Sequence, residues 1–322
     1  MAVYTKLNRE NVEEILSNYS IGSLREFRGI EEGIENTNYF LLVGNKKYIL
    51  TIYEKRVNEK DLPFFSNLMS SLNKAGFKCP VPIESNNKRT IINYNNKNLM
   101  IVSFLEGKAK SILSPVDCKS VGQEIAKMHQ ITKDFKMHRA NALSINSWRK
   151  IFDQVKGKCI QIHKDLPRLI ESNLADVEKN WPKDLPTGII HADLFSDNIF
   201  FNNEKFSGII DFYFSCNDFY ALEIAICFNA LCFDGPKNNL SFNVTKAINF
   251  MNGYNQLRKL NDNEKKNIKV LSQGSALRFL LTRVFDAINT VEGAIVKVKD
   301  PMEYLVRLEF HKNSKDFEDY FF

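Results

Sequence analysis

Two patterns of hydrophobic residues divide the chain, one typical of strands in the first third and one typical of helices in the remainder. In the first third, apolar residues at helical spacing predict helices over residues 8–19 and 61–75. Alternating apolar and polar positions predict strands over residues 24–30, 37–43, 47–53, 90–94 and 98–104. Gly44 and Asn45 predict a hairpin turn between the second and third of these strands. We therefore expect a small, mostly antiparallel sheet with a packed helix.

After Gly107, most apolar residues recur at helical spacing. The predicted helices cover residues 115–131, 148–156, 159–178, 221–232, 244–257 and 263–289. Short apolar runs at 187–190, 199–201 and 206–212 predict strands embedded among these helices, and the last two form a hairpin. The pattern predicts an α+β chain of two lobes. Residues 1–103 form a small antiparallel β-rich N-terminal lobe, and residues 104–322 form a larger, mainly helical C-terminal lobe.

The embedded hairpin carries the residues that point to chemistry. His191, Asp193 and Asn198 stand in the order His-x-Asp-x-x-x-x-Asn, and Asp211 follows within Ile-Asp-Phe. A kinase-type site needs one carboxylate to orient a hydroxyl and take its proton, and further oxygen ligands to hold Mg²⁺ against phosphates. We therefore predict Asp193 as the catalytic base and Asn198 with Asp211 as the metal ligands. His191 is expected to brace the loop rather than to carry a proton.

Two further segments are candidates for nucleotide binding. A polar turn between the first two strands contains Gly33, Asn36 and Asn38, which are placed where a flap would cover phosphates. A plain hairpin turn is the alternative. The connector between the lobes, residues 101–107, offers backbone groups at Ser103 and Leu105 that would contact an adenine edge. A simple crossing between the lobes is the alternative there.

Composition limits the partners and the compartment. The net charge of +6 is spread along the chain without a basic cluster, so we expect no nucleic-acid partner. The six cysteines form no C-x-x-C pair, which favours reduced thiols. The start lacks the apolar core of a signal peptide, and no uncharged apolar run approaches a membrane span. We expect a cytoplasmic protein without a membrane partner; the oligomeric state is not predicted.

The catalytic stretch resembles the aminoglycoside-phosphotransferase and choline-kinase-like family, which has a protein-kinase-like fold. The closer resemblance is to the homoserine kinases of that fold and covers essentially the whole chain. The segments that carry it are residues 1–5, 33–36, 48–56, 61–65, 210–218, 277–283 and 299–305. The resemblance implies ATP-dependent, Mg²⁺-dependent phosphorylation of the side-chain hydroxyl of L-homoserine, which gives O-phospho-L-homoserine on the route to threonine.

One position departs from the wider kinase pattern. The third strand usually supplies a Lys or Arg to the phosphates, and here that position is Thr51. The homoserine kinases share this Thr, so the departure does not imply inactivity. It leaves the cationic partner of the α- and β-phosphates unassigned.

The charges of homoserine, a zwitterion, indicate which residues its site requires. The site needs an anion near the ammonium and a cation near the carboxylate. We predict Asp218 and Glu223 for the ammonium and Arg283 for the carboxylate. A helix N-cap is the alternative for Asp218, and a structural ion pair is the alternative for Arg283.

Two other functions are compatible with parts of the sequence. A kinase for another small alcohol, such as an aminoglycoside or choline, would share the catalytic motif, although a polycationic acceptor calls for a more acidic lining. A non-catalytic nucleotide-binding module is suggested by Thr51 and opposed by the intact Asp193, Asn198 and Asp211.

Overall fold

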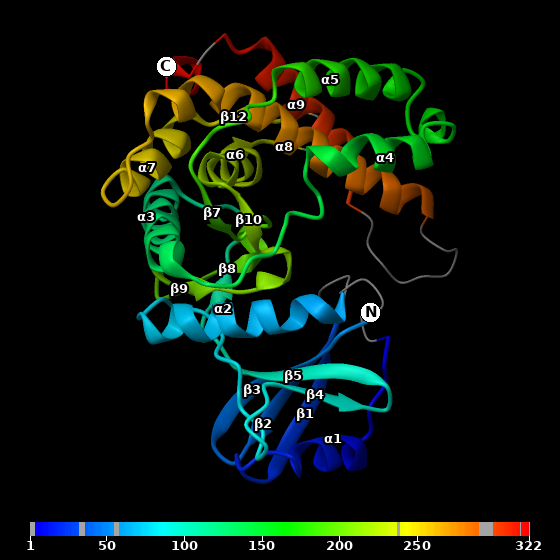
Figure 1. Ribbon diagram of the computed structural model, residues 1–322, viewed down its shortest axis with the longest axis vertical. Coiled ribbons are helices and arrows are strands. Elements are labelled where there is room, and N and C mark those ends of the chain that lie inside the picture. The colour runs from blue at the N-terminus through cyan, green and yellow to red at the C-terminus, as the bar shows by residue number, and fades with distance from the viewer. Residues whose placement is uncertain are drawn as a thin grey trace.

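The structure is a computed structural model, which describes residues 4–31, 36–54, 58–236, 239–289, 299–315 and 317–321. Figure 1 shows the N-terminal sheet with helix α1 (Arg9–Leu16) at one end of the molecule and most of the other helices at the opposite end. This arrangement of an antiparallel sheet followed by a mostly helical part confirms the predicted α+β class.

The N-terminal sheet has the strand order β1-β2-β3-β5-β4, with every neighbouring pair antiparallel. Its strands are β1 (Leu24–Ile30), β2 (Thr37–Val43), β3 (Lys46–Ile52), β4 (Ile91–Tyr94) and β5 (Lys97–Ser103). These bounds lie within a residue or two of the predicted ones. The hairpin between β2 and β3 turns at Gly44, which adopts a positive φ of 56° that suits glycine.

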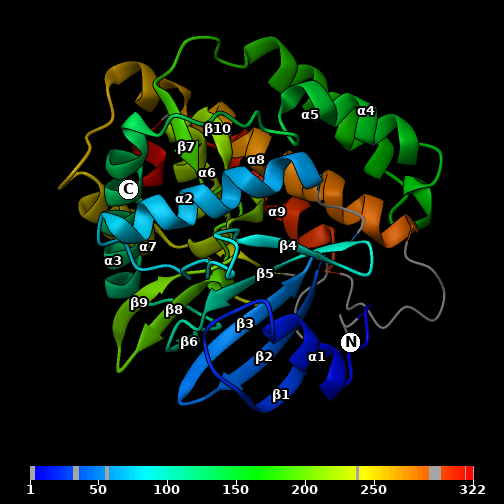
Figure 2. The same ribbon diagram turned by 60° about the horizontal axis from the view of Figure 1, so that its bottom comes forward.

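The two faces of this sheet belong to different cores. Helix α1 (Arg9–Leu16) covers one face, and its Val12 and Ile15 are buried against strand residues such as Leu41 and Leu50. Helix α2 (Leu62–Lys74) packs differently, because its buried residues, among them Phe65, join the core of the helical part. Figure 2 shows α2 crossing between the sheet and the helices.

The position of α2 bears on the predicted division into lobes. The chain leaves the sheet at the end of β5, next to residue 103, where the sequence predicts the boundary. Because α2 packs with the helical part, the larger core contains residues from both sides of that boundary.

The second part of the chain contains seven α-helices among the described residues. They are α3 (Pro115–Ile131), α4 (Ile145–Val155), α5 (Leu166–Asn180), α6 (Tyr220–Leu231), α7 (Val244–Tyr254), α8 (Asp262–Asn289) and α9 (Met302–Asn313). None of the helices in the described ranges is long and apolar enough to cross a lipid bilayer. All six cysteines are buried and free of disulfides.

Short strands between these helices position the catalytic motif. Strands β8 (Ile199–Asn202) and β9 (Lys205–Ile209) form the predicted hairpin, and β6 (Lys108–Ala109) pairs with β8. Strand β7 (Thr187–Ile190) pairs antiparallel with β10 (Cys216–Phe219). A last small pair is β11 (Phe233–Asp234) with β12 (Ser241–Phe242).

The structure differs from the predicted elements at several places. The helix predicted over 159–178 is split into a 3₁₀ turn, Cys159–Gln161, and α5, which begins at Leu166 just before Pro167. Proline suits the first turn of a helix but not its interior, so a new helix starts there. Helix α9 and strands β6 and β10 are not predicted, because their apolar residues lack a clear period and their partners are distant in sequence.

Candidate active site

The catalytic motif occupies the loop between β7 and β8, and Asp211 follows β9. Pairing of Ile190 with Cys216 brings the two ends of this segment together. The backbone N–H of Ile210 donates to the Asn198 carbonyl at 3.0 Å. This bond places Asp211 beside Asn198, as the hairpin in the sequence predicts.

His191 is a neutral brace in this arrangement. Its Nδ1 accepts from the Asp193 backbone N–H at 3.3 Å, so its Nε2 carries the proton that bonds the Ile210 carbonyl at 2.9 Å. Burial lowers the pKa of His191 to about 4. The imidazole therefore joins the catalytic loop to the segment that precedes Asp211 and stays uncharged at neutral pH.

Asn198 is oriented by Asp193. Its Nδ2 donates to the Asp193 carbonyl at 2.9 Å and lies 3.5 Å from the Asp193 carboxylate. Since the amide nitrogen is used in this way, the carboxamide oxygen is directed away from Asp193 and suits a metal ligand.

Asp193 itself is half-buried at the centre of the loop. Burial raises the pKa of its carboxyl group to about 6, an effect opposed by the charges of Arg278 and Lys299 and reinforced by Asp197. A carboxylate with a raised pKa is a stronger base than an exposed one and remains ionised at neutral pH. These properties fit a residue that accepts a hydroxyl proton.

Ala192 connects the motif to two buried charges. It adopts a left-handed conformation with φ of 66°, which costs a non-glycine residue about 1–2 kcal/mol. Glu223 accepts from the backbone N–H groups of His191 and Ala192, the latter at 3.2 Å. Arg278 donates to the Ala192 carbonyl at 2.6 Å. The two side chains thus hold Ala192 through the peptide groups on either side of it and support the position of Asp193.

Glu223 therefore differs from its predicted role. The sequence predicts a contact with the acceptor's ammonium, but the side chain is completely buried and its carboxylate is bonded to the catalytic loop. Burial raises its pKa to about 7. Because an ammonium cannot reach this carboxylate without displacing the loop, we correct the prediction and assign Glu223 to loop positioning.

The other two predicted acceptor residues also have protein partners. Arg283 donates to the Glu303 carboxylate at 2.9 Å and to the Asp300 carbonyl at 2.8 Å. The contact with Glu303 is a structural ion pair, the alternative that the sequence offers for Arg283. Asp218 accepts from Asn141 at 2.7 Å. It lies in β10 and is not the N-cap of α6, which is the next residue, Phe219.

The turn predicted to cover the nucleotide is described in part. Gly33 lies outside the described residues. Asn36 is buried at the base of the turn, where its side-chain oxygen accepts from the Glu54 backbone N–H at 3.3 Å. Asn38 accepts from the Thr51 hydroxyl at 2.8 Å. The position that usually carries a lysine thus forms a neutral hydrogen bond between β2 and β3.

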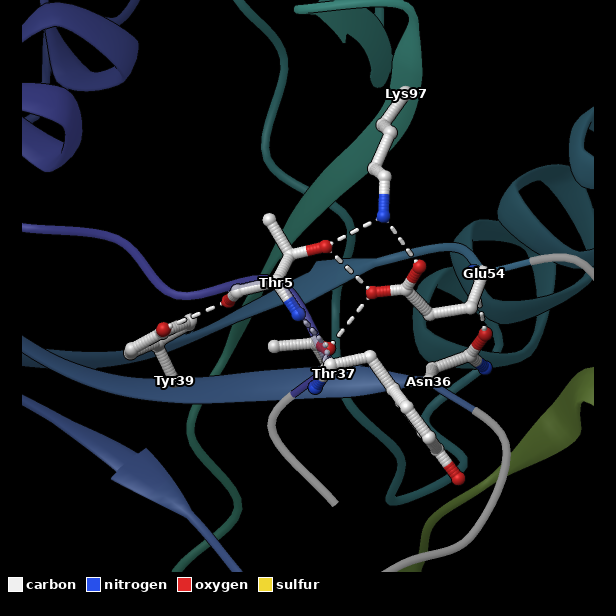
Figure 3. A network of polar contacts seen from close by, with 7 residues as sticks. Thr5, Asn36, Thr37, Tyr39, Glu54 and Lys97 are labelled. Atoms are coloured by element: carbon white, nitrogen blue, oxygen red, sulfur yellow. Dashed lines mark hydrogen bonds and ion pairs between the residues drawn. The ribbon is translucent and has the colours of Figure 1, made fainter. Parts of the chain in front are cut away.

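Figure 3 shows the polar network that anchors this turn. The Glu54 carboxylate accepts from Thr5 at 2.7 Å and from Thr37 at 2.8 Å, and pairs with Lys97 at 2.5 Å. Tyr39 donates to the Thr5 carbonyl at 2.8 Å. These contacts join the N-terminal arm, the first residue of β2 and the segment that follows β3 at one point.

The connector lies where β5 ends. Ser103 exchanges two bonds with Val81, each 2.9 Å long, and the half-buried Leu105 follows it. Phe40 and Phe104 meet edge to face at 5.7 Å on the sheet face opposite α1. An open pocket of ≈ 400 Å³ lies beside the connector, lined by Asn45, Lys46, Lys47, Tyr48, Ile83, Ser103, Phe104 and Glu106. Although much of this lining is polar or charged, the Tyr48 and Phe104 rings next to backbone polar groups offer a stacking surface for a purine.

The described residues contain no group of three or more His, Cys, Asp or Glu side chains placed to hold a metal ion. A site made of Asn198 and Asp211 is smaller than such a group. It suits Mg²⁺, which keeps several waters and substrate phosphates as ligands.

A model of the phosphotransferase enzyme family matches residues 26–248. The homoserine kinase of Afipia carboxidovorans is 43% identical over 99% of this chain and 97% of its own length. The homoserine kinase of Rhodopseudomonas palustris strain CGA009 is 44% identical over the same shares of the two chains. The chain belongs to the homoserine kinase family.

Solved structures show the same fold at low identity. An amicoumacin kinase in complex with AMP-PNP and Ca²⁺ superposes with a TM-score of 0.70 at 12% identity, over 97% of this chain and 95% of that one. The choline kinase from Cryptosporidium parvum gives 0.65 at 15%, over 95% and 94% of the two chains. The predicted two-lobed kinase-like fold of this family is thus confirmed.

Proposed function

We propose that this chain transfers the γ-phosphate of ATP to the side-chain hydroxyl of L-homoserine. The observation that carries the proposal is the 42–44% identity to curated homoserine kinases over nearly the full length of both chains. The motif geometry supports the reaction class, because the proposed base and the carboxamide lie on one loop and the second carboxylate follows the strand β9, next to Ile210, which is bonded to that loop.

In this reaction Asp193 receives the proton of the homoserine hydroxyl while the hydroxyl oxygen bonds to the γ-phosphorus and the bond to ADP breaks. Asn198 and Asp211 would hold Mg²⁺, which supplies charge neutralisation at the phosphates. The catalytic loop, with its base and metal ligand, is held in position by Glu223, Arg278 and His191. Positioning of this kind is the larger part of catalysis when the transition state is loose.

The β-rich lobe would bind the nucleotide. We propose that Asn36 and Asn38 set the flap over the phosphates together with Gly33, and that backbone groups of Ser103 and Leu105 contact the adenine. The helical lobe, residues 104–322, would then carry the acceptor. A cytoplasmic location, where ATP and reduced thiols are available, is part of the same proposal.

The test is ADP release from MgATP by purified protein with L-homoserine, L-serine, choline or an aminoglycoside as the acceptor. We expect turnover that depends on L-homoserine and exceeds turnover with the other acceptors by at least an order of magnitude. Turnover that favours choline or an aminoglycoside would refute the proposed substrate and keep the reaction class. Nucleotide binding without turnover on any acceptor would refute both.

A further inference from the structure

Close to Asp193 lie two opposite charges that the reaction as described does not use. Asp197 lies in the 3₁₀ turn Ser196–Asn198, directly before the proposed metal ligand. Lys299 precedes α9 and approaches Asp197 with an Nζ to Oδ2 distance of 3.4 Å. Both side chains are accessible, with 47% of Lys299 and 63% of Asp197 exposed.

The pair is loosely held. At 3.4 Å it is longer than a strong charge-assisted hydrogen bond, which measures about 2.7–2.9 Å. The ammonium of Lys299 also lies 4.8 Å from the centre of the Phe195 ring. An exposed ion pair of this length contributes little to stability, so a ligand can exchange for either partner at low cost.

Both charges act on the base. Beyond the dominant effect of burial, the pKa of Asp193 is lowered by Arg278 and by Lys299 and raised by Asp197. The two side chains are therefore within electrostatic reach of the atom that receives the hydroxyl proton. A small molecule whose hydroxyl contacts Asp193 would bring its other charges to this pair.

The neighbouring arginines are committed elsewhere. Arg278 is 4% exposed and donates to the Ala192 carbonyl. Arg283 pairs with Glu303, and Arg307 donates to the carbonyls of Asn229 and Glu303. Each of these three guanidinium groups is largely shielded from solvent and donates to a protein oxygen, although the buried Nε of Arg278 has no hydrogen-bond partner among the described residues. The Lys299 ammonium, in contrast, has solvent access.

We propose that Lys299 and Asp197 form the zwitterion clamp of the acceptor, with Lys299 binding the α-carboxylate and Asp197 the α-ammonium. On binding, the two protein charges exchange their mutual contact for the opposite charges of the substrate, so no charge is left uncompensated. The pair thus selects an amino acid that carries a side-chain alcohol. This inference rests on the proposed homoserine kinase activity and names residues other than the predicted Asp218, Glu223 and Arg283.

Two analogues separate the two halves of the clamp. 3-Amino-1-propanol is homoserine without its carboxylate, and 4-hydroxybutyrate is homoserine without its ammonium. For the wild type, Lys299→Met and Asp197→Asn, kcat/KM is measured with all three acceptors at saturating MgATP. Lys266→Met, an exposed lysine on α8, is the matched control and should behave as the wild type.

We expect Lys299→Met to lower the ratio of kcat/KM for homoserine to kcat/KM for 3-amino-1-propanol by roughly 10- to 100-fold. This is the range expected for one charged hydrogen bond. Asp197→Asn should narrow the preference for homoserine over 4-hydroxybutyrate by a similar factor. The Mg²⁺ concentration for half-maximal rate should stay unchanged in both variants, which separates acceptor binding from damage to Asn198.

The clamp is refuted if either variant lowers kcat/KM for all three acceptors by one common factor, or changes none of them. A wild type that ignores homoserine but phosphorylates another alcohol would overturn the proposed function together with the clamp. A wild type active on homoserine, with unchanged preferences in the variants, would overturn the clamp alone.

Discussion

Arg139 and Asp61 form an ion pair of 2.7 Å that ties the start of α2 to the loop following Asp211. The same guanidinium donates to the Phe214 and Ser215 carbonyls at 3.3 and 3.0 Å. In the wider kinase pattern, a strand lysine and a helix glutamate couple the N-terminal lobe to the active site. With Thr51 in the lysine position, the Arg139 contacts provide a physical link between α2 and the segment that follows the proposed metal ligand Asp211.

Replacing Arg139 should therefore disturb metal use more than acceptor use. We expect Arg139→Gln to raise the Mg²⁺ concentration for half-maximal rate by about tenfold, since a charge-assisted contact is worth about 1.5–3 kcal/mol. Arg168→Gln, which alters an exposed arginine in a 3.8 Å pair with Asp165, is the control. Equal Mg²⁺ requirements in the wild type and Arg139→Gln would contradict the link.

The loop-positioning role of Glu223 predicts a graded response. Glu223→Ala leaves the backbone N–H groups of His191 and Ala192 buried without an acceptor, at a cost of about 1–3 kcal/mol each. We expect kcat to fall at least 100-fold, and to fall less in Glu223→Gln, which keeps one acceptor oxygen. Adding Ala192→Gly should recover part of the loss, because glycine adopts φ of 66° without strain. A larger loss in Glu223→Gln than in Glu223→Ala would be inconsistent with this role.

The raised pKa of Asp193 predicts an acidic limit to activity. The base acts as a carboxylate, so kcat/KM for homoserine should fall tenfold per pH unit below its pKa of about 6 and level off above it. His191, with its pKa near 4, stays neutral across this range and does not add a second limb. If the acidic fall of kcat/KM persists in Glu223→Gln, the titrating group is Asp193 and not Glu223. A fall that begins only near pH 4 would instead indicate an ordinary, exposed carboxyl group.

The crossing of α3 and α7 gives a prediction about stability. A Cβ at Gly122 would lie 2.0 Å from the Phe250 carbonyl oxygen, and one at Gly253 would lie 1.9 Å from the Lys119 carbonyl oxygen. Either Gly→Ala change should force the helices apart and destabilise the fold by about 1–3 kcal/mol or more. Gly157→Ala, where nothing lies within 4 Å, is the control in a thermal unfolding experiment. Equal unfolding temperatures for the wild type and for the Gly122→Ala and Gly253→Ala variants would contradict the close approach of the two helices.

The sequence predicts the parts of this molecule whose partners are close along the chain. The catalytic motif and Asp211 are separated by one hairpin, so their meeting follows from the strand pattern. Arg139 and Asp61 are 78 positions apart, and Arg278 and Ala192 are 86 apart, and no local pattern pairs them. Arg283 and Glu223 have residue types that suit an acceptor site, but burial and existing partners decide their roles, and these depend on tertiary packing. Lys299 and Asp197 lie in segments already marked by the motif and the family resemblance, yet only the fold brings them together.

We propose above that Asp193 is the base for phosphorylation of L-homoserine. The most direct test is the formation of O-phospho-L-homoserine from MgATP, followed by phosphorus NMR, for the wild type and Asp193→Asn. We expect product with the wild type and a kcat lower by about 10²–10⁴-fold in the variant, with an unchanged unfolding temperature. Wild-type turnover in Asp193→Asn, or no phosphohomoserine from the wild type, would contradict it.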